Sequence, residues 1–235
     1  MAIGNVTPDS FYSGSRLGSD EQIVSWAKGA ISDGADILDI GGCSTRPGSI
    51  PVSEEEEWRR VEPALAAIRR ELPDATLSLD TFRTEIARRA IGQFGPMIIN
   101  DISGGDDDMY ALVRAYNISY IWTLRGDPEL PANHPEMMDM NLILDPGFGF
   151  IGSTEKDFEC MRQLDRLSGY GLPVLVGVSR KSMVYKPLGL TPETCLAPTQ
   201  ALQLYALEHG ATILRTHDVI ETAQTIKLFE GLKVF

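Results

Sequence analysis

The chain has 235 residues, of which 43% are hydrophobic and 23% are charged. These values are close to the averages of about one half and about one quarter for soluble globular proteins, which excludes a disordered chain, a collagen and a coiled coil, and the length predicts one domain over residues 1–235. The net charge of -12 repels a polyphosphate backbone, so we expect no nucleic-acid partner, whereas a local basic cluster remains able to bind a small anion.

Eight short apolar runs recur along the chain, and each predicts a strand that is covered on both faces. In chain order these runs begin at Ala2, Asp36, Thr76, Met97, Ile118, Leu142, Pro173 and Ala211. Segments with helical periodicity connect them; the clearest have apolar faces over residues 23–30 and 58–68. Eight such alternations predict a (β/α)8 TIM barrel, with an open doubly wound sheet as the alternative.

Two segments around these elements have a composition of their own. Residues 126–140 include prolines at 128, 131 and 135, too many for a normal covering helix, so we expect a shortened or missing fifth helix. The acidic run at 54–57 is interpreted as the solvated first turn of a helix.

The predicted strands end on polar residues, and in a parallel barrel all these ends meet at the mouth that holds the chemistry. In chain order the residues are Asn5, Asp39, Asp80, Asn100, Arg125, Asp145, Lys181, Arg215 and His217. Isolated charges at such positions cost several kcal/mol unless they are paired or bind a ligand. A set of structural ion pairs and helix caps is the alternative interpretation.

The types of these side chains indicate two adjoining binding pockets. Carboxylate and amide groups with a lysine suit a flat nitrogen heterocycle whose edge carries donors and acceptors; these residues are Asp80, Asn100, Asp145 and Lys181. A cationic group suits a diphosphate; it consists of Arg46, Arg215 and His217. Asn5 offers an oxygen ligand for Mg²⁺, which prefers such oxygens together with phosphate.

The sequence indicates neither a membrane or exported protein nor a protein stabilised by disulfides or structural zinc. No apolar run approaches the roughly 18 residues of a membrane span, and the N-terminus lacks the pattern of a leader peptide. We therefore expect a cytoplasmic protein without a membrane partner. Cys43, Cys160 and Cys195 form no CxxC pair, so no disulfide framework or structural zinc site is predicted.

Seven segments together resemble dihydropteroate synthase in content and order: NVTPDSF, DIGGCSTRPG, LDTFR, INDISGG, ILDPGFGF, VLVGVSRKS and LRTHDV. Enzymes of this family are (β/α)8 transferases of folate synthesis. They join 6-hydroxymethyl-7,8-dihydropterin diphosphate to p-aminobenzoate and release diphosphate with the help of Mg²⁺. The resemblance implies the same substrates and cofactor here, and it implies a homodimer and sensitivity of the p-aminobenzoate site to sulfonamides.

The resemblance also implies a role for each matching residue. Asp80, Asn100, Asp145 and Lys181 would hold the pterin, and the catalytic set would comprise Asp80, Asp145, Lys181 and Arg46. Asn5 would contact Mg²⁺ and diphosphate, and Arg215 and His217 would bind the diphosphate. The p-aminobenzoate site would be framed by Thr45, Arg46, Pro47, Phe148 and Ser182. No protein nucleophile is needed.

Several departures from the family pattern motivate one alternative function, and a second alternative is a class of enzymes that shares the pterin barrel. Gly4 replaces an apolar residue and is expected to loosen the first strand, Trp122 and Thr123 are expected near the pterin pocket wall, and Ile151 and Gly152 stand where the family has Gly and Lys. The usual N-terminal hairpin is also expected to be absent. A pterin-binding paralogue with little activity is one alternative. A methyltetrahydrofolate methyltransferase is another, although the STRPG and SRKS segments have no role in methyl transfer.

Overall fold

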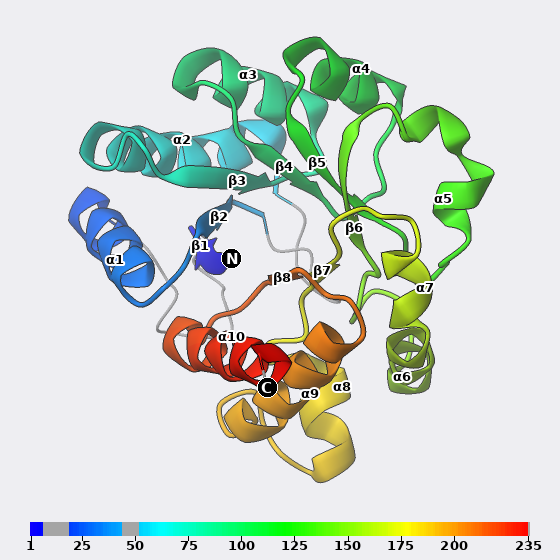
Figure 1. The fold of residues 1–235 in the computed structure, drawn as a ribbon. Helices are drawn as coiled ribbons and strands as arrows, with labels where there is room; N and C mark the ends of the chain where they lie inside the picture. Colours follow the sequence, from blue (N-terminus) through cyan, green and yellow to red (C-terminus); the bar gives the residue numbers. More distant parts are fainter. Residues whose placement is uncertain (7–18, 44–51, 235) are drawn as a thin grey trace. The chain divides into compact units, whose positions relative to one another are not determined.

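The computed structural model describes residues 1–6, 19–43 and 52–234 (Figure 1). The chain divides into two compact units, Met1–Tyr120 and Ile121–Phe235, and each is described by itself. In both units short strands alternate with helices, as the apolar runs predict.

The described part of the first unit includes four parallel strands that are hydrogen-bonded in chain order. They are β1 (Ala2–Asn5), β2 (Ile37–Gly41), β3 (Thr76–Asp80) and β4 (Ile98–Asp101). Their connecting helices are α1 (Asp20–Ser32), α2 (Glu54–Glu71), α3 (Thr84–Phe94) and, after β4, α4 (Asp107–Tyr116). Asn5 lies opposite Gly41, Gly41 opposite Asp80, and Asp80 opposite Asn100, so the register brings the polar strand ends into one row.

The helices of this unit begin where their capping residues stand. Ser19, Ser53 and Asp106 each accept a hydrogen bond from a backbone N–H in the first turn of α1, α2 and α4, respectively. The predicted apolar face of α2 is buried: Val61, Leu65 and Ile68 have no exposed surface. The helical periodicity at 58–68 is therefore confirmed as the face that covers the strands.

Gly4 does not loosen β1, because its missing side chain makes room for an indole. A Cβ atom on Gly4 would lie 2.5 Å from Cη2 of Trp26 on α1 and 3.0 Å from Cδ1 of Ile40. The structure thus corrects the interpretation of this departure. In this chain Trp26 of α1 fills the space that an apolar side chain at position 4 would otherwise occupy.

A Gly4→Leu substitution is expected to destabilise the chain by about 1–3 kcal/mol through overpacking against Trp26. In a Trp26→Ala background the same substitution is expected to cost much less, since the indole is gone. Urea unfolding of the two single variants and the double variant measures this coupling. Gly29→Ala is the control, because no atom outside the backbone of α1 and the adjacent residues lies within 4 Å of its new Cβ. If the effects of Gly4→Leu and Trp26→Ala on the free energy of unfolding were additive, the packing of Trp26 into the space at Gly4 would be contradicted.

The second unit has the same chain-order pattern. It includes the end of β5 (Ser119–Thr123), then β6 (Asn141–Asp145), β7 (Leu175–Val176) and β8 (Ile213–Leu214). Leu124 N donates to Asp145 O at 2.8 Å, Leu144 forms a parallel bridge with Val174, and β7 pairs with β8 in parallel. Among the described residues, the strands of each unit pair in chain order without the reversal that a doubly wound sheet requires, which favours the barrel.

Helices of the second unit include two that the sequence did not predict. The set is α5 (Leu130–Asn133), η2 (Pro135–Met137), α6 (Thr154–Arg162), α7 (Leu164–Ser168), α8 (Ser182–Tyr185), η3 (Lys186–Leu188), α9 (Leu196–Glu208) and α10 (Val219–Val234). The helices α8 and η3, after β7, are too short to produce a periodic signal.

The fifth crossover is short, as the prolines predict. The helix α5 has four residues and is followed by the single turn η2. Trp122 of β5 is buried, and its ring lies edge-on to His134 at 6.0 Å between centroids. The expectation that Trp122 narrows a pterin pocket is therefore wrong: its indole packs against the crossover segment between α5 and η2.

Candidate active site

In the first unit the candidate residues lie at the carboxyl ends of β1, β3 and β4. Asn5 and Asp80 are half-buried, and Asn100 is buried. Gly41 separates Asn5 from Asp80 in the register, and a Cβ atom there would lie 3.3 Å from Cβ of Asp80. Glycine at 41 lets the carboxylate lie close against the neighbouring strand.

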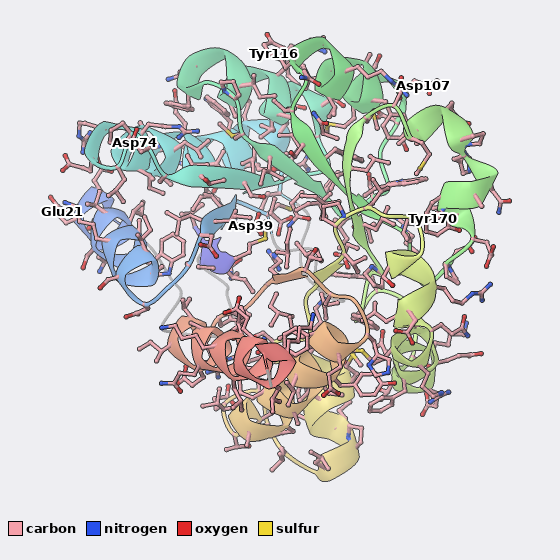
Figure 2. All side chains as sticks on the ribbon, viewed as in Figure 1. Glu21, Asp39, Asp74, Asp107, Tyr116 and Tyr170 are labelled. Atoms are coloured by element: carbon pink, nitrogen blue, oxygen red, sulfur yellow. The ribbon has the colours of Figure 1, made fainter. Side chains whose placement is uncertain are left out.

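Asn100 is oriented by a carboxylate that the sequence placed at a strand end without a specific role. The structure corrects that placement, because Asp39 lies in the middle of β2 (Ile37–Gly41). Asp39 (Figure 2) is fully buried, and its Oδ2 accepts a hydrogen bond from Nδ2 of Asn100 at 3.1 Å. The amide nitrogen of Asn100 is thereby held toward Asp39. We infer that Asp39 positions Asn100.

The segment after Asn100 is fixed by a second buried carboxylate. Asp101 accepts hydrogen bonds from Ser103 N at 2.7 Å and from the Tyr120 hydroxyl at 3.0 Å. Burial raises the pKa of Asp101 and, together with the Asp101 charge, raises the pKa of Tyr120. Because its pKa is raised, the Tyr120 hydroxyl stays protonated and keeps donating to Asp101. This hydrogen bond holds the INDISGG segment, to which Asp101 belongs, against β5.

The first turn of α2 differs from the solvated turn that the acidic run predicted. Glu57 is fully buried, accepts a hydrogen bond from Thr81 Oγ1 at 2.6 Å, and pairs with Arg83. The sequence held a signal for this, because Glu57 precedes Val61 by four residues and so continues the apolar face of the helix. The prediction that residues 54–57 form a solvated first turn is therefore wrong for Glu57.

In the second unit, Asp145 ends β6 and is held by the turn that follows. Its Oδ1 accepts a hydrogen bond from Gly147 N at 2.8 Å. Gly147 has φ +86°, and a Cβ atom there would lie 3.0 Å from Cγ2 of Thr123 and 3.2 Å from Arg125 N. The turn therefore requires glycine, and it sets the direction of the Asp145 carboxylate.

Lys181 reaches the same turn from the segment after β7. Its Nζ donates to the backbone oxygen of Phe148 at 2.5 Å and lies 4.9 Å from the centre of the Phe150 ring. Buried Asp157 accepts a hydrogen bond from Gly149 N at 2.8 Å. Burial raises the pKa of Asp157, while that hydrogen bond and the Lys181 charge oppose the rise. Asp145 and Lys181 thus share one structured turn.

Arg215 and His217 follow β8, and Arg215 approaches the same glycine as Lys181. A Cβ atom on Gly177 would lie 3.7 Å from both Lys181 Nζ and Arg215 Cβ, so these two side chains approach the same glycine. The His217 ring nitrogen Nδ1 is 3.0 Å from Ser179 Oγ, and His217 N donates to the same hydroxyl at 3.1 Å. This grouping of lysine, arginine and histidine around residues 177–179 suits an anion.

The predicted p-aminobenzoate residues are described only in part. Thr45, Arg46 and Pro47 lie outside the described residues. Phe148 is fully buried and offers its carbonyl oxygen to Lys181, whereas Ser182 is half-buried at the start of α8. The roles of these residues remain predictions.

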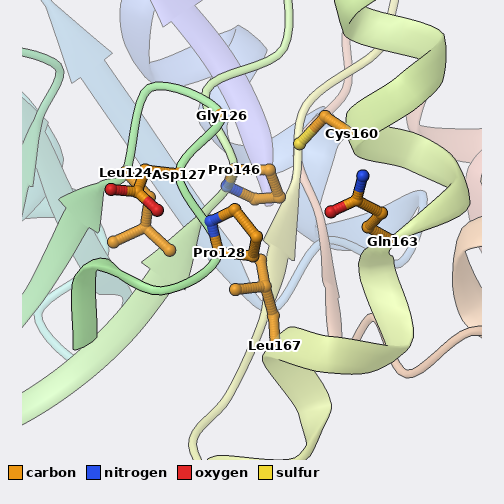
Figure 3. A pocket seen from close by; sticks show the side chains of 8 residues that line it. All are labelled: Leu124, Gly126, Asp127, Pro128, Pro146, Cys160, Gln163 and Leu167. Atoms are coloured by element: carbon orange, nitrogen blue, oxygen red, sulfur yellow. The ribbon is translucent and has the colours of Figure 1, made fainter. Parts of the chain in front are cut away.

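A small hollow in the second unit has none of the predicted site residues in its lining (Figure 3). It is lined by Leu124, Gly126, Asp127, Pro128, Pro146, Cys160, Gln163 and Leu167. Burial and three neighbouring carboxylates raise the pKa of Cys160 to about 12, so its thiol stays protonated at neutral pH and is a poor nucleophile.

Two negative findings hold for the described ranges 1–6, 19–43 and 52–234. These ranges contain no group of three or more His, Cys, Asp or Glu side chains placed to bind a metal ion. None of their helices has the length and apolar character of a membrane-spanning segment.

Comparison with known proteins identifies the family. The family model described as pterin binding enzyme matches residues 1–141 and 131–217. The dihydropteroate synthase of Bacillus subtilis is 36% identical over 99% of this chain and 87% of its own length, and that of Clostridium beijerinckii is 37% identical over 97% and 91%.

Solved structures give the same result and confirm the barrel class. The dihydropteroate synthase of Clostridium difficile, solved in the presence of pteroic acid, has a TM-score of 0.87 and 32% identity over 98% of this chain and 95% of its own. The Xanthomonas albilineans enzyme with 4-aminobenzoic acid has a TM-score of 0.85 and 32% identity, covering 100% and 92%. The fold is therefore the predicted (β/α)8 barrel, and the chain belongs to the dihydropteroate synthase family of pterin binding enzymes.

Proposed function

We propose that the chain condenses 6-hydroxymethyl-7,8-dihydropterin diphosphate with p-aminobenzoate to give 7,8-dihydropteroate and diphosphate. The observation that carries the proposal is the grouping of Lys181, Arg215 and His217 beside the turn that fixes Asp145. It offers a cationic site for the leaving diphosphate next to a carboxylate that suits the pterin edge. Relatives named dihydropteroate synthase support this activity.

The pterin is assigned to carboxylate and amide groups and to a lysine. Asp80 and Asp145 accept N–H bonds from the ring edge, Asn100 adds a further polar contact, and Lys181 donates to a ring acceptor. The Asp39–Asn100 bond and the Asp145–Gly147 bond reduce the freedom of the groups that would hold the ring. Substrate binding then costs less conformational entropy.

The reaction exchanges one bond for another at the methylene carbon of the pterin. The carbon–oxygen bond to diphosphate breaks, the amine nitrogen of p-aminobenzoate forms a bond to the carbon, and the amine loses one proton. Positive charge develops on the pterin and negative charge on the leaving group. Asp80 and Asp145 stabilise the former, while Arg215, His217 and Arg46 stabilise the latter.

The residues present fit Mg²⁺ bound mainly through the diphosphate. Mg²⁺ usually takes one or two protein oxygens and completes its shell with water and substrate phosphates. Asn5, half-buried at the end of β1, is the proposed protein ligand. When bound, the ion neutralises charge on the departing diphosphate.

The second substrate and the assembly are proposed from family membership. Thr45, Arg46, Pro47, Phe148 and Ser182 frame p-aminobenzoate, the compound named for the Xanthomonas albilineans structure. A sulfonamide is named for the Yersinia pestis family structure, so this site is also the proposed sulfonamide target.

We further propose a cytoplasmic homodimer formed through the late helices. Leu228 and Leu232, one turn apart on α10, are each 61% exposed, which supplies apolar surface for a second copy. Sedimentation at micromolar concentration measures the mass, and a monomer would contradict the proposed dimer.

Two measurements on the purified chain test the function. Calorimetry with the pterin diphosphate and Mg²⁺ measures binding, and release of diphosphate after addition of p-aminobenzoate measures turnover. We expect both, with turnover dependent on p-aminobenzoate. Tight binding without diphosphate release would instead show a pterin-binding protein that is not a synthase. Trp122 and Gly4 give no reason to expect this, because their packing against His134 and Trp26 fills no predicted site.

A further inference from the structure

We propose that Glu57 is a positioning residue that holds the Asp80–Asn100 edge of the first unit in its binding geometry. This inference rests on the proposed function, since it concerns how those two residues present themselves to the pterin. Glu57 is fully buried, and a buried carboxylate is retained only where its hydrogen bonds are well satisfied.

The contact that carries the inference runs from Glu57 to the residue directly after Asp80. Thr81 is 1% exposed, and its hydroxyl donates to Glu57 Oε1 at 2.6 Å. The backbone N–H of Thr81 donates to Asn100 O at 3.0 Å. Thr81 therefore joins the ends of β3 and β4, and Glu57 fixes Thr81 from the helix side.

Glu57 also packs against Gly42, directly after the strand that pairs with β3. A Cβ atom on Gly42 would lie 3.0 Å from Glu57 O and 3.3 Å from Glu57 Cγ. Gly42 follows Gly41, the glycine against which the Asp80 side chain lies. The first turn of α2 thus contacts the residues that directly follow β2 and β3.

Arg83 completes the arrangement by neutralising the buried charge. It pairs with Glu57, donates to Val52 O at 2.6 Å, and its backbone N–H donates to Thr81 Oγ1 at 3.2 Å. Thr81 Oγ1 therefore donates to Glu57 and accepts from Arg83 N. A side chain fixed by one donated and one accepted bond has a single favoured orientation.

Thr81→Val tests the inference with little change in shape, because it replaces only the hydroxyl by a methyl group. We expect the Kd for pterin diphosphate, measured by calorimetry without p-aminobenzoate, to rise about tenfold, the size typical of losing a bond that orients a binding group. Thr81→Ser, which keeps the hydroxyl, is expected to bind like the unaltered chain. Glu57→Gln is expected to weaken binding at least as much as Thr81→Val.

Glu55→Gln is the matched control. Glu55 lies in the same helical turn and pairs with Arg89 of α3 at 2.8 Å, but its side chain is 78% exposed, so this variant should bind normally. All Kd values are taken well below each melting temperature, where a merely structural role would leave binding unchanged. Lower melting temperatures with unaltered Kd for Thr81→Val and Glu57→Gln would overturn the inference.

Failure of the inference is distinguishable from failure of the function. If the unaltered chain binds pterin diphosphate and Thr81→Val binds equally well, only the positioning role is wrong. If the unaltered chain does not bind it, the proposed function and the role that rests on it are both wrong. Should Glu57→Gln fail to fold, the comparison of Thr81→Val with Thr81→Ser decides the matter alone.

Discussion

Lys181→Met is expected to raise the Kd for pterin diphosphate by about 100-fold or more while the chain stays folded. The ammonium group donates to Phe148 O and lies near Arg215 and the Asp145 turn, so its loss removes a charged donor from a partly buried site. Truncating one partner of such a charged hydrogen bond typically costs about 2–5 kcal/mol. Methionine keeps an aliphatic stem against Gly149 and removes the ammonium that lies over the Phe150 ring.

Calorimetry measures this change, and a thermal melt confirms folding. Lys186→Met is the control, because Lys186 is an exposed lysine at the start of η3 and the same loss of charge there should leave Kd within about twofold, as expected for a surface charge. Equal affinity of Lys181→Met and the unaltered chain would remove Lys181 from the pterin site.

Asp218→Ala is expected to destabilise the chain by about 3–5 kcal/mol, because it leaves the Arg180 guanidinium buried without its carboxylate. The pair is bidentate, with Nη2 to Oδ1 at 2.5 Å and Nε to Oδ2 at 3.1 Å, and the two side chains are 10% and 9% exposed. Arg180 also has φ +57°, a conformation that non-glycine residues rarely adopt. The ion pair holds it there, directly before Lys181.

Chemical denaturation gives the size of this effect. The double variant Arg180→Met/Asp218→Leu is expected to be more stable than Asp218→Ala, since it removes both buried charges. The control is Glu129→Ala in the exposed Glu129–Arg166 pair, whose side chains are each 52% exposed and whose loss should cost less than about 1 kcal/mol. Equal losses in Asp218→Ala and Glu129→Ala would show that burial of the Arg180 pair has no energetic consequence.

Several features of this chain follow from local sequence patterns alone. The eight apolar runs appear as β1–β8, the apolar face of α2 is buried, and the prolines between 126 and 140 shorten α5. These predictions succeed because periodicity and proline geometry act over a few residues. The seven family segments likewise placed the chain in its family, which the comparisons confirm.

Other features depend on which residues meet across the fold. The glycine at position 4 and the indole at position 26 are complementary, yet 21 residues separate them. The sequence of β1 considered by itself therefore predicted a weakened strand. Trp122 gave no sign of its direction, because a strand covered on both faces has apolar residues pointing both ways. Its contact with His134 decides that it faces the crossover.

By itself the sequence determined the order of strands and helices, the family, and the identity of the polar residues at the strand ends, because each of these depends on residue type and spacing along the chain. Only the tertiary structure decided which carboxylates support others, such as Asp39 for Asn100 and Glu57 for Thr81. The sequence does not distinguish a buried carboxylate from a solvated one, because the residue type is the same. They differ in the partners that folding brings within hydrogen-bonding distance.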